Sequence, residues 1–349
     1  MPSPSASART SAPRSRAPRS PAPTAPQHLI AAPAGAQAQP ARCLEGGSEP
    51  VAAHRWQGSK ARVWRQILGH AALQRPGGGR WRRWIEPFYG CGVMAQAAIS
   101  LGLANEYHLA DLCAPLVVAH RTLALMPQAL LARLALLAPR PGASPAEAEH
   151  AYGTAAGWMR HHCRALALAR GALLTDLTVA ARFFLLLGSN FNGLWRVNRD
   201  GEYNVPVGRR SASAPPLVYQ LDAARAGLLA QNTALRQPGV SLVCADMLTT
   251  IESAGAGDVV YSDPPYCGTH SAYTAGKFPL VLHAELARAL RCAAARGAVV
   301  LLSNSTSPQT LEIYHRPGDN VCAVLARRSG GRTAASRGTV QELLIHMRG

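Results

Sequence analysis

The sequence lacks several features that would place it in common protein classes. None of its apolar runs reaches the roughly 18 residues of a membrane-spanning helix, because Arg, His, Gly or Pro interrupts each one, including Leu123–Ala138. Its eight cysteines form no C-x-x-C pair, which argues against a secreted disulfide framework and favours reduced thiols in a cytoplasm. No G-x-x-x-x-G-K sequence is present, so ATP chemistry on a phosphate-binding loop is disfavoured.

Metal ligands are also scarce. The nearest candidate, His161-His162-Cys163, is isolated, whereas a zinc site needs paired ligands at short spacing. We therefore expect no bound metal and no membrane partner.

Acidic residues are few, and the formal net charge is +17 with a pI near 10.3. Such an excess is typical of a chain that binds nucleic acid. The alternative is a basic tail on a neutral enzyme. The tail does carry Arg9, Arg14, Arg16 and Arg19, but most of the excess lies in the body of the chain.

Residues 1–50 contain almost no large apolar residue and no acid before Glu45. Such a segment cannot bury enough surface to offset its ordering entropy, so we predict a disordered tail. Its Arg/Ser-rich composition is also that of an organelle transit peptide, although its prolines oppose the amphipathic helix such a peptide forms. Non-specific nucleic-acid contact, or a start codon placed too early, remain alternatives.

From about Arg55 the pattern changes to short apolar strands that end in Gly, Asp or Pro and alternate with helical stretches. This pattern predicts an α/β fold with a doubly wound, Rossmann-like sheet. The predicted strands are Arg83–Phe88, Tyr107–Ala110, Val240–Cys244, Asp258–Tyr261 and Ala298–Ser303, closed by a hairpin of Val321–Leu325 and Val340–His346.

About 130 residues separate the second and third of these strands, far more than a crossover connection needs. Leu116–Leu137 and Ala146–Leu187 are rich in Ala and Leu and predict several helices, followed by a polar, Gly-rich hairpin or loop. We therefore expect a catalytic domain of residues 51–115 and 236–349, with a mainly helical domain of residues 116–235 inserted in it.

The first strand runs into a Gly-rich turn, Phe88-Tyr89-Gly90-Cys91-Gly92, and then into a helix. A turn of this kind lets backbone approach a nucleotide-like ligand closely, although G-x-G alone fits any tight strand-to-helix turn. Asp111 closes the next strand about 20 residues later, where doubly wound folds place an acid on ribose hydroxyls. Together the two features predict a bound nucleoside.

Another strand ends in D-P-P-Y, Asp263 to Tyr266. Because proline cannot donate to a sheet ladder, Pro264 and Pro265 end the strand and force a rigid exit at the sheet's carboxyl edge, where open parallel sheets bind ligands. The turn thus fixes the Asp263 carboxylate, the Pro264 carbonyl and the Tyr266 ring. The alternative is a plain turn with a helix-capping acid and a packed ring.

Two acceptors and one ring suit a specific reaction. If the two acceptors take hydrogen bonds from both N–H groups of an amine on an aromatic base, the lone pair of that amine is freed to attack a methyl group in line. A base in a duplex must be flipped out to reach them, and Tyr266 would stack on it. No covalent nucleophile is needed, and Cys267 is interpreted as packing because no base pairs with it.

With these stretches in view, the chain resembles the Dam-type (alpha group) DNA adenine-N6 methyltransferases. The resemblance runs from about Trp56 to Ile345, and the sequences that carry it are WQGSK, IEPFYGCG, LADL, NFNGLWRVNRDGEYNVPVG, DPPY and LLSNS. It implies a site-specific DNA methylase that uses S-adenosyl-L-methionine on double-stranded DNA in a prokaryotic or phage setting, with a cognate restriction endonuclease as a candidate partner.

The resemblance also implies residue roles. Contacts to S-adenosylmethionine would come from the first tryptophan and lysine, from the Gly-rich turn and from acids after three strands: Trp56, Lys60, Phe88, Gly90, Gly92, Asp111, Asp246 and Asp263. The catalytic residues would be Asp263, Pro264, Pro265 and Tyr266. W-x-G-x-K by itself is more often the start of a surface helix.

A DNA-contacting hairpin would lie within the insert. Asn192, Arg196, Asn198 and Arg199 are donors suited to phosphates or base edges. The aromatic residues between them, Phe191, Trp195 and Tyr203, are not expected of a merely polar exposed loop. HSAYTAGKF, with Tyr273 and Lys277, would close over the flipped base.

Ser59 replaces a glycine usual in the family, and the helices of the insert indicate no particular target sequence, so GATC should not be assumed. Two rival functions stay open at this stage. One is methylation of RNA or of another planar amine, and the other is a DNA-binding relative that has lost catalysis.

Overall fold

The computed structural model describes residues 49–74, 79–169, 175–211, 213–267, 278–327 and 339–349. All of them belong to one compact unit, Ala32–Gly349. Of the predicted tail, only residues 49 and 50 are described, so the disorder prediction for the rest lies outside the described residues.

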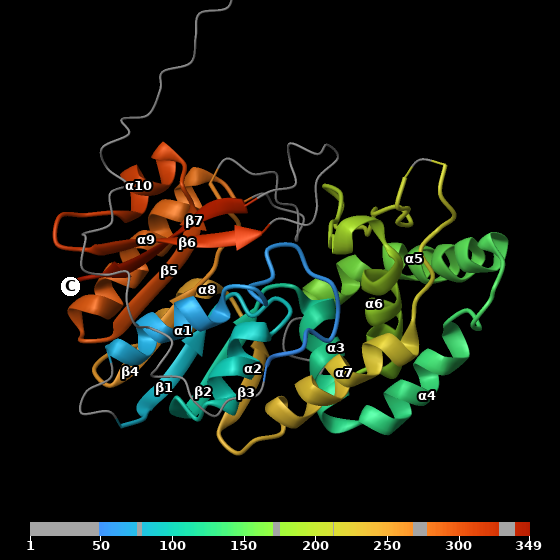
Figure 1. The fold of residues 1–349 in the computed structure, drawn as a ribbon, viewed down its shortest axis with the longest axis horizontal. Helices are drawn as coiled ribbons and strands as arrows, with labels where there is room; N and C mark the ends of the chain where they lie inside the picture. The colour runs from blue at the N-terminus through green and yellow to red at the C-terminus, as the bar shows by residue number, and fades with distance from the viewer. Residues whose placement is uncertain (1–48, 75–78, 170–174, 212, 268–277, 328–338) are drawn as a thin grey trace, which may run out of the picture. The chain divides into compact units, whose positions relative to one another are not determined.

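A seven-stranded sheet forms the frame of the fold, in the order β3-β2-β1-β4-β5-β7-β6 (Figure 1). The first five of these pair in parallel, and β7 runs antiparallel to both β5 and β6. The order reverses between β1 and β4, which makes that boundary a topological switch point. The strands are Trp81–Glu86 (β1), Ala104–Asp111 (β2), Val240–Cys244 (β3), Asp258–Ser262 (β4), Val299–Ser305 (β5), Asn320–Arg327 (β6) and Thr339–Met347 (β7).

Helices cover both faces of the sheet, because neighbouring residues of each buried strand enter different hydrophobic clusters. Trp84 and Tyr261 pack into a cluster with α1 (Trp64–Leu73), α2 (Val93–Ser100) and α3 (Ala114–Leu125). Ile85 and Val260 pack on the other face with α8 (Met247–Ile251), α9 (Leu280–Ala295) and α10 (Pro308–Tyr314). The predicted α/β, doubly wound fold is confirmed.

Each predicted strand is present, and one difference in strand ends bears on the site. The prediction ran from Arg83 to Phe88, whereas β1 ends at Glu86. Pro87 has no N–H for the ladder, so the chain leaves the sheet there and Phe88 already belongs to the following turn.

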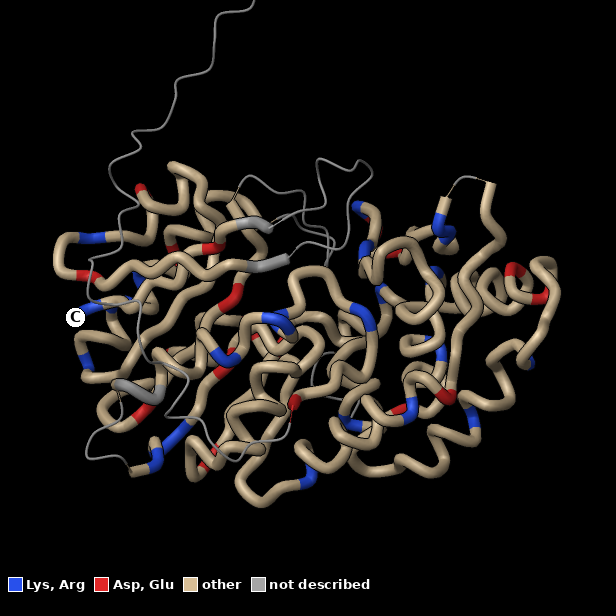
Figure 2. Tube along the Cα trace, in the orientation of Figure 1, with Lys and Arg blue, Asp and Glu red and all other residues tan. Residues whose placement is uncertain are grey.

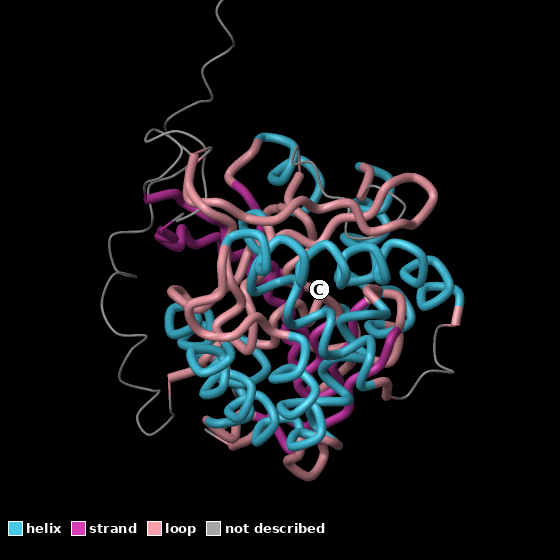
Figure 3. The backbone as a smooth tube through the Cα atoms, turned by 90° about the vertical axis from the view of Figure 1, so that its right-hand side faces the viewer, coloured by secondary structure: helices cyan, strands magenta, loops and turns pink. Residues whose placement is uncertain are grey.

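Between β2 and β3 the chain forms the predicted helical segment (Figure 3). Its helices are α3, α4 (Pro127–Leu137), α5 (Pro145–Leu168), α6 (Leu177–Ser189) and α7 (Leu221–Leu235), and a short 3-10 turn, η4, spans Phe191–Gly193. Ser144 and Glu147 form a capping box at the start of α5, and Asp176 caps α6 through the N–H groups of Thr178 and Val179. These caps satisfy backbone donors that a helix start otherwise leaves free.

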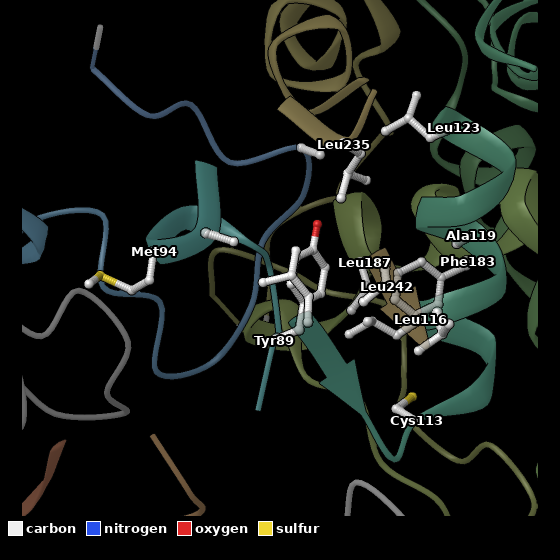
Figure 4. Close-up of a cluster of buried hydrophobic side chains, with 14 of the residues drawn as sticks. Tyr89, Met94, Cys113, Leu116, Ala119, Leu123, Phe183, Leu187, Leu235 and Leu242 are labelled. Carbon is white, nitrogen blue, oxygen red and sulfur yellow. The ribbon is translucent and has the colours of Figure 1, made fainter. Parts of the chain in front are cut away.

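Helix α6 is the centre of this segment and packs against α3, α4 and α5. Its core is continuous with that of the sheet. Figure 4 shows Phe183 and Leu187 of α6 gathered with Leu116 of α3, Leu242 of β3 and Tyr89 of the turn after β1. The helical segment is therefore held against the side of the sheet formed by β2 and β3 through shared apolar contacts.

The amino end of β4 is fixed by a buried ion pair. Asp258 has no exposed side-chain surface, and its two oxygens accept hydrogen bonds from the guanidinium groups of Arg82 and Arg83 at 2.6 to 3.1 Å. The pair joins β1 to β4 at the end of the sheet opposite the D-P-P-Y turn.

Asp258→Ala is expected to lower the free energy of unfolding by about 3 kcal/mol, because it leaves the mostly buried Arg83 guanidinium and the N–H of Gly255 without their carboxylate partner. Urea denaturation followed by circular dichroism measures the change. Asp222→Ala, at an exposed position in the first turn of α7, is the control and should unfold like the parent protein. An unchanged urea midpoint in the Asp258 variant would contradict this role.

Within the part of the chain that is described, no helix has both the length and the apolar character to cross a bilayer.

Candidate active site

The turn after β1 lies at the switch point and depends on two glycines with positive φ. Gly90 has φ 53° and Gly92 has φ 71°. A Cβ on Gly90 would lie 3.0 Å from the Trp56 indole nitrogen, and one on Gly92 would collide with the Tyr89 hydroxyl. The absence of side chains here lets Trp56 lie directly on the turn and lets α2 begin at Val93.

Asp111, at the end of β2, holds this turn in place. Its Oδ2 accepts a hydrogen bond from Gly90 N and its Oδ1 one from Cys113 N, both at 2.9 Å. Burial raises the pKa of this carboxyl, and the hydrogen bonds from backbone N–H groups partly offset that effect. The structure thus joins the two features that together predicted a nucleoside site.

The D-P-P-Y turn follows β4, the neighbour of β1. Asp263 Oδ2 lies 2.7 Å from Lys60 Nζ, and Oδ1 is buried without a hydrogen-bond partner among the described residues. Burial raises the Asp263 pKa to about 6, although the Lys60 ammonium opposes the rise. One oxygen is anchored and the other is available to a ligand.

Lys60 is the cation of this site, and only 4% of its side chain is exposed. Its Nζ also donates to Gly58 O at 2.8 Å, lies 3.8 Å from Glu342 Oε2 and sits 5.2 Å from the centre of the Tyr266 ring. Burial lowers the Lys60 pKa, but the nearby Asp263 carboxylate and Glu342 outweigh this effect and leave it above its ordinary value.

Asn304 fixes the far end of the D-P-P-Y turn. It is fully buried in β5, within the predicted LLSNS stretch. Its Oδ1 accepts hydrogen bonds from Cys267 N at 3.3 Å and Ser305 N at 2.8 Å. Cys267 itself is buried, and burial raises its pKa. Its thiol is therefore not activated, in agreement with the packing role that the sequence indicated.

Sequence reasoning missed Glu86, the last residue of β1. It is 2% exposed and accepts a hydrogen bond from Trp84 Nε1 at 3.0 Å. Burial, with smaller contributions from Asp263 and Asp111, raises the Glu86 pKa to about 8, although the hydrogen bond from Trp84 opposes the rise. The signal was present in the sequence, since Glu86 ends a buried strand directly before the Gly-rich turn.

Asp246 lies at the same edge of the sheet, after β3. Its Oδ1 accepts from Leu248 N at 2.8 Å and so caps α8. Because Cys244 pairs with Asp111 in the strand register, Asp246 lies beyond the ends of the neighbouring strands β2 and β3.

The predicted DNA-contacting residues lie in a hairpin that follows α6 and is closed by bridges of Asn190 with Val207 and of Val197 with Tyr203. Asn192, Arg196 and Arg199 are exposed. Arg196 donates to the Asn204 side chain at 2.7 Å. Asn198 instead shapes the turn, because its Oδ1 accepts hydrogen bonds from the backbone of Asp200 and Glu202.

Two of the aromatic residues that distinguish this hairpin from a merely polar exposed loop are buried. Trp195 and Tyr203 are 2% and 1% exposed. Trp195 packs on Phe183, and the Tyr203 hydroxyl lies 3.0 Å from that of Tyr152 in α5. Successive hairpin side chains point to opposite faces, so these rings enter the helical core while Arg196 faces outward. Tyr273 and Lys277 lie outside the described residues.

Taken together, these observations define a doubly wound α/β protein with a cluster of carboxyl groups at the switch point of its sheet. The family model of the D12 class N6 adenine-specific DNA methyltransferases matches residues 56–329. The chain belongs to that family.

Three relatives show how far the likeness extends. The DNA N-6-adenine-methyltransferase of Escherichia phage P1 is 35% identical over 174 residues, 48% of this chain and 22% of that protein. The type II methyltransferase M1.LlaDCHI of Lactococcus lactis subsp. cremoris is 30% identical over 178 residues, 49% of this chain and 59% of that protein. The Retron Ec67 DNA adenine methylase of Escherichia coli is 25% identical over 291 residues, 83% and 89% of the two chains. This chain thus spans less than two thirds of the first two relatives.

Proposed function

We propose that the protein transfers a methyl group from S-adenosyl-L-methionine to the exocyclic N6 amine of adenine in double-stranded DNA. The observation that carries the proposal is the D-P-P-Y turn, in which Lys60 holds Asp263 Oδ2 while Oδ1 remains free to accept an N–H. Family membership supports the same reaction.

The residues at the switch point fit S-adenosylmethionine, which supplies an electrophilic methyl group on a positively charged sulfur. Carboxyl groups lie at the ends of β2 and β1 and directly after β4, and their negative charge favours a cationic ligand. That of Glu86 is buried, and those of Asp111 and Asp263 are partly buried. We assign contacts with its nucleoside part to Asp111, with Asp246 near the adenine, and contacts with its methionine part to the turn from Phe88 to Gly92. Trp56 would provide an aromatic wall.

Asp263 acts on the target amine. Its Oδ1, with the Pro264 carbonyl, would accept the two N–H bonds and turn the nitrogen lone pair towards the methyl carbon. As the new N–C bond forms, the S–CH3 bond of the cofactor would break and leave neutral S-adenosylhomocysteine. One N–H proton would leave the nitrogen for the Asp263 carboxylate, which is ionised above pH about 6. Pro265 stiffens the turn, and the Tyr266 ring would stack on the flipped adenine.

The helical segment and its hairpin would bind DNA. Residues 116–235 contain twelve arginines and no lysine against six acids, and basic residues are spread over both the strands and the helices (Figure 2). We propose Asn192, Arg196 and Arg199 as contacts to phosphates or base edges. Asn198, whose amide is used within the turn, would position Arg199 beside it.

Arg199→Ala is expected to weaken DNA binding about five- to tenfold and to reduce the slope of log affinity against log salt by about one, because one phosphate contact is lost. Fluorescence anisotropy with a duplex at several salt concentrations measures both quantities. Arg288→Ala, at an exposed position on α9, is the matched control. An unaltered salt slope in the Arg199 variant would remove it from the interface.

The function is tested by expressing the chain in cells that lack adenine methylation and sequencing their DNA with a method that reads N6-methyladenine in context. The expected result is methylation at one sequence motif, and mass spectrometry of the digested nucleosides identifies the product. Methylated cytosine or methylated RNA would establish the rival substrate. If calorimetry detects no binding of S-adenosylmethionine, the rival function of a DNA-binding protein without catalysis would be established.

A cognate restriction endonuclease is proposed as a partner because the lactococcal relative is a type II methyltransferase. In that case the gene beside this one encodes a nuclease that cuts the motif found by sequencing, and methylation protects the motif from it. We propose a cytoplasmic location, where the chain would meet its DNA.

A further inference from the structure

Four carboxyl groups lie in a row along the carboxyl edge of the sheet. Asp111 ends β2, Glu86 ends β1, Asp263 follows β4, and Glu342 lies in β7 opposite Ser305 of β5. Lys60 is the cation of this row, and it contacts only Asp263 and Glu342 among them. The middle of the row, at the switch point, therefore carries an acid with no basic partner among the described residues.

That acid is Glu86. Its hydrogen bond comes from a neutral donor, Trp84 Nε1, at 3.0 Å. The titratable groups that act on it or are acted on by it are Asp263 of the turn after β4, Asp111 of β2, and Tyr89 and Cys91 of the turn after β1. None of these is basic. A buried carboxylate surrounded in this way is costly, so the neutral acid is favoured while no cation is present.

We propose that Glu86 is a protonated carboxyl group in the cofactor-free protein, and that it gives up its proton when the cationic cofactor binds. The proposal rests on the proposed function, since it takes S-adenosylmethionine as the ligand. The cofactor brings a positive charge into a buried site where Coulomb interactions are strong. That charge stabilises the carboxylate form of Glu86, and the released proton goes to solvent.

The coupling makes cofactor affinity depend on pH. With a Glu86 pKa of about 8 in the free protein, about 0.9 proton is released on binding at pH 7 and about 0.1 at pH 9. Affinity should rise about fifteenfold from pH 6.5 to pH 8 and by about another factor of two by pH 9. Asp263, with its pKa of about 6, is already mostly ionised at pH 7 and contributes about a tenth of a proton.

Isothermal titration calorimetry of the full chain with S-adenosylmethionine tests this, in two buffers of different ionisation enthalpy at pH 7 and pH 9. Glu86→Gln, which mimics the neutral acid, should bind the cofactor with less than about 0.2 proton released and with affinity nearly independent of pH. Glu106→Gln, on the exposed part of β2, is the matched control and should behave like the parent. Glu86→Asp, which keeps a carboxyl group, should still release a proton.

An infrared difference spectrum of the parent protein gives a readout that needs no stable variant. The band of a protonated carboxyl group should disappear when S-adenosylmethionine is added. Cofactor binding without proton release, or with an unchanged infrared band, would overturn the role of Glu86 while leaving the proposed function intact. Failure of the parent protein to bind S-adenosylmethionine at all would instead overturn the proposed function, and this inference with it.

Discussion

Asp263→Ala is expected to reduce methyl transfer about a thousandfold or more, because the substitution removes the carboxylate that we propose as the acceptor directing the lone pair of the target amine. The loss should appear in the rate of the chemical step. S-adenosylmethionine should still bind, since Asp111 and the turn after β1 are untouched. The fold should also persist, because Lys60 keeps its contacts with Gly58 O and Glu342.

Single-turnover transfer of a labelled methyl group to duplex DNA measures this rate, while calorimetry reports cofactor binding and circular dichroism reports the fold. Glu252→Ala, at an exposed position directly after α8 and outside the proposed DNA-binding segment, is the control for a lost carboxylate. Asp263→Asn is a second test, because an amide has one oxygen where the carboxylate has two. If that oxygen faces Lys60, the NH2 group replaces the proposed acceptor; if it faces the amine, the NH2 group faces Lys60. Turnover near the parent level in either Asp263 variant would exclude this carboxylate from catalysis.

Much of this site could be predicted because local sequence determines it. A strand that ends at Ser262 and is followed by two prolines indicates a rigid turn at the sheet edge. This prediction does not depend on which residues surround the turn. Asp111 and the glycines of the first turn also follow from spacing, and the structure joins them by the hydrogen bond from Gly90 N. Such features depend on backbone chemistry within a few residues, which a single sequence displays.

What could not be predicted depends on contacts between distant segments. Lys60 and Asp263 are separated by some two hundred residues, so their ion pair could not be inferred from either motif. The burial of Trp195 and Tyr203 also depends on where α5 and α6 lie. Polar and aromatic residues alternate along the hairpin, so the sequence does not indicate which of its two faces is buried. Glu86 was missed because its importance comes from Asp111 and Asp263, which lie on other strands.

The amino-acid composition indicates that a lysine is specifically required at position 60. Of the 36 basic residues, only Lys60 and Lys277 are lysines, so the chain uses arginine nearly everywhere else. A compact ammonium group at this position can lie close to Asp263 Oδ2, Gly58 O and the Tyr266 ring at once. A planar guanidinium is larger and directs its donors in a fixed fork. We therefore expect Lys60→Arg to be poorly tolerated, although it keeps the charge.

Lys60→Met is expected to shift the acid limb of the pH–rate profile upward from about pH 6 to well above pH 7. Lys60 lowers the Asp263 pKa, so its removal leaves burial and Glu342 to raise that pKa further. At pH 7 most Asp263 would then be protonated. Its Oδ1 would be a weaker acceptor, and transfer should fall about a hundredfold.

The rate of the chemical step, measured from pH 5.5 to pH 9.5, separates this electrostatic role from a structural one. A variant that only loosens the site would be slow at every pH, whereas Lys60→Met should recover a large part of its activity above pH 8 as Asp263 ionises. The protein should also lose about 3 kcal/mol of stability, because one partner of a buried pair is gone. An acid limb still near pH 6 would mean that Lys60 does not determine the pKa of Asp263. The bound cofactor or the bound DNA would then determine that pKa instead.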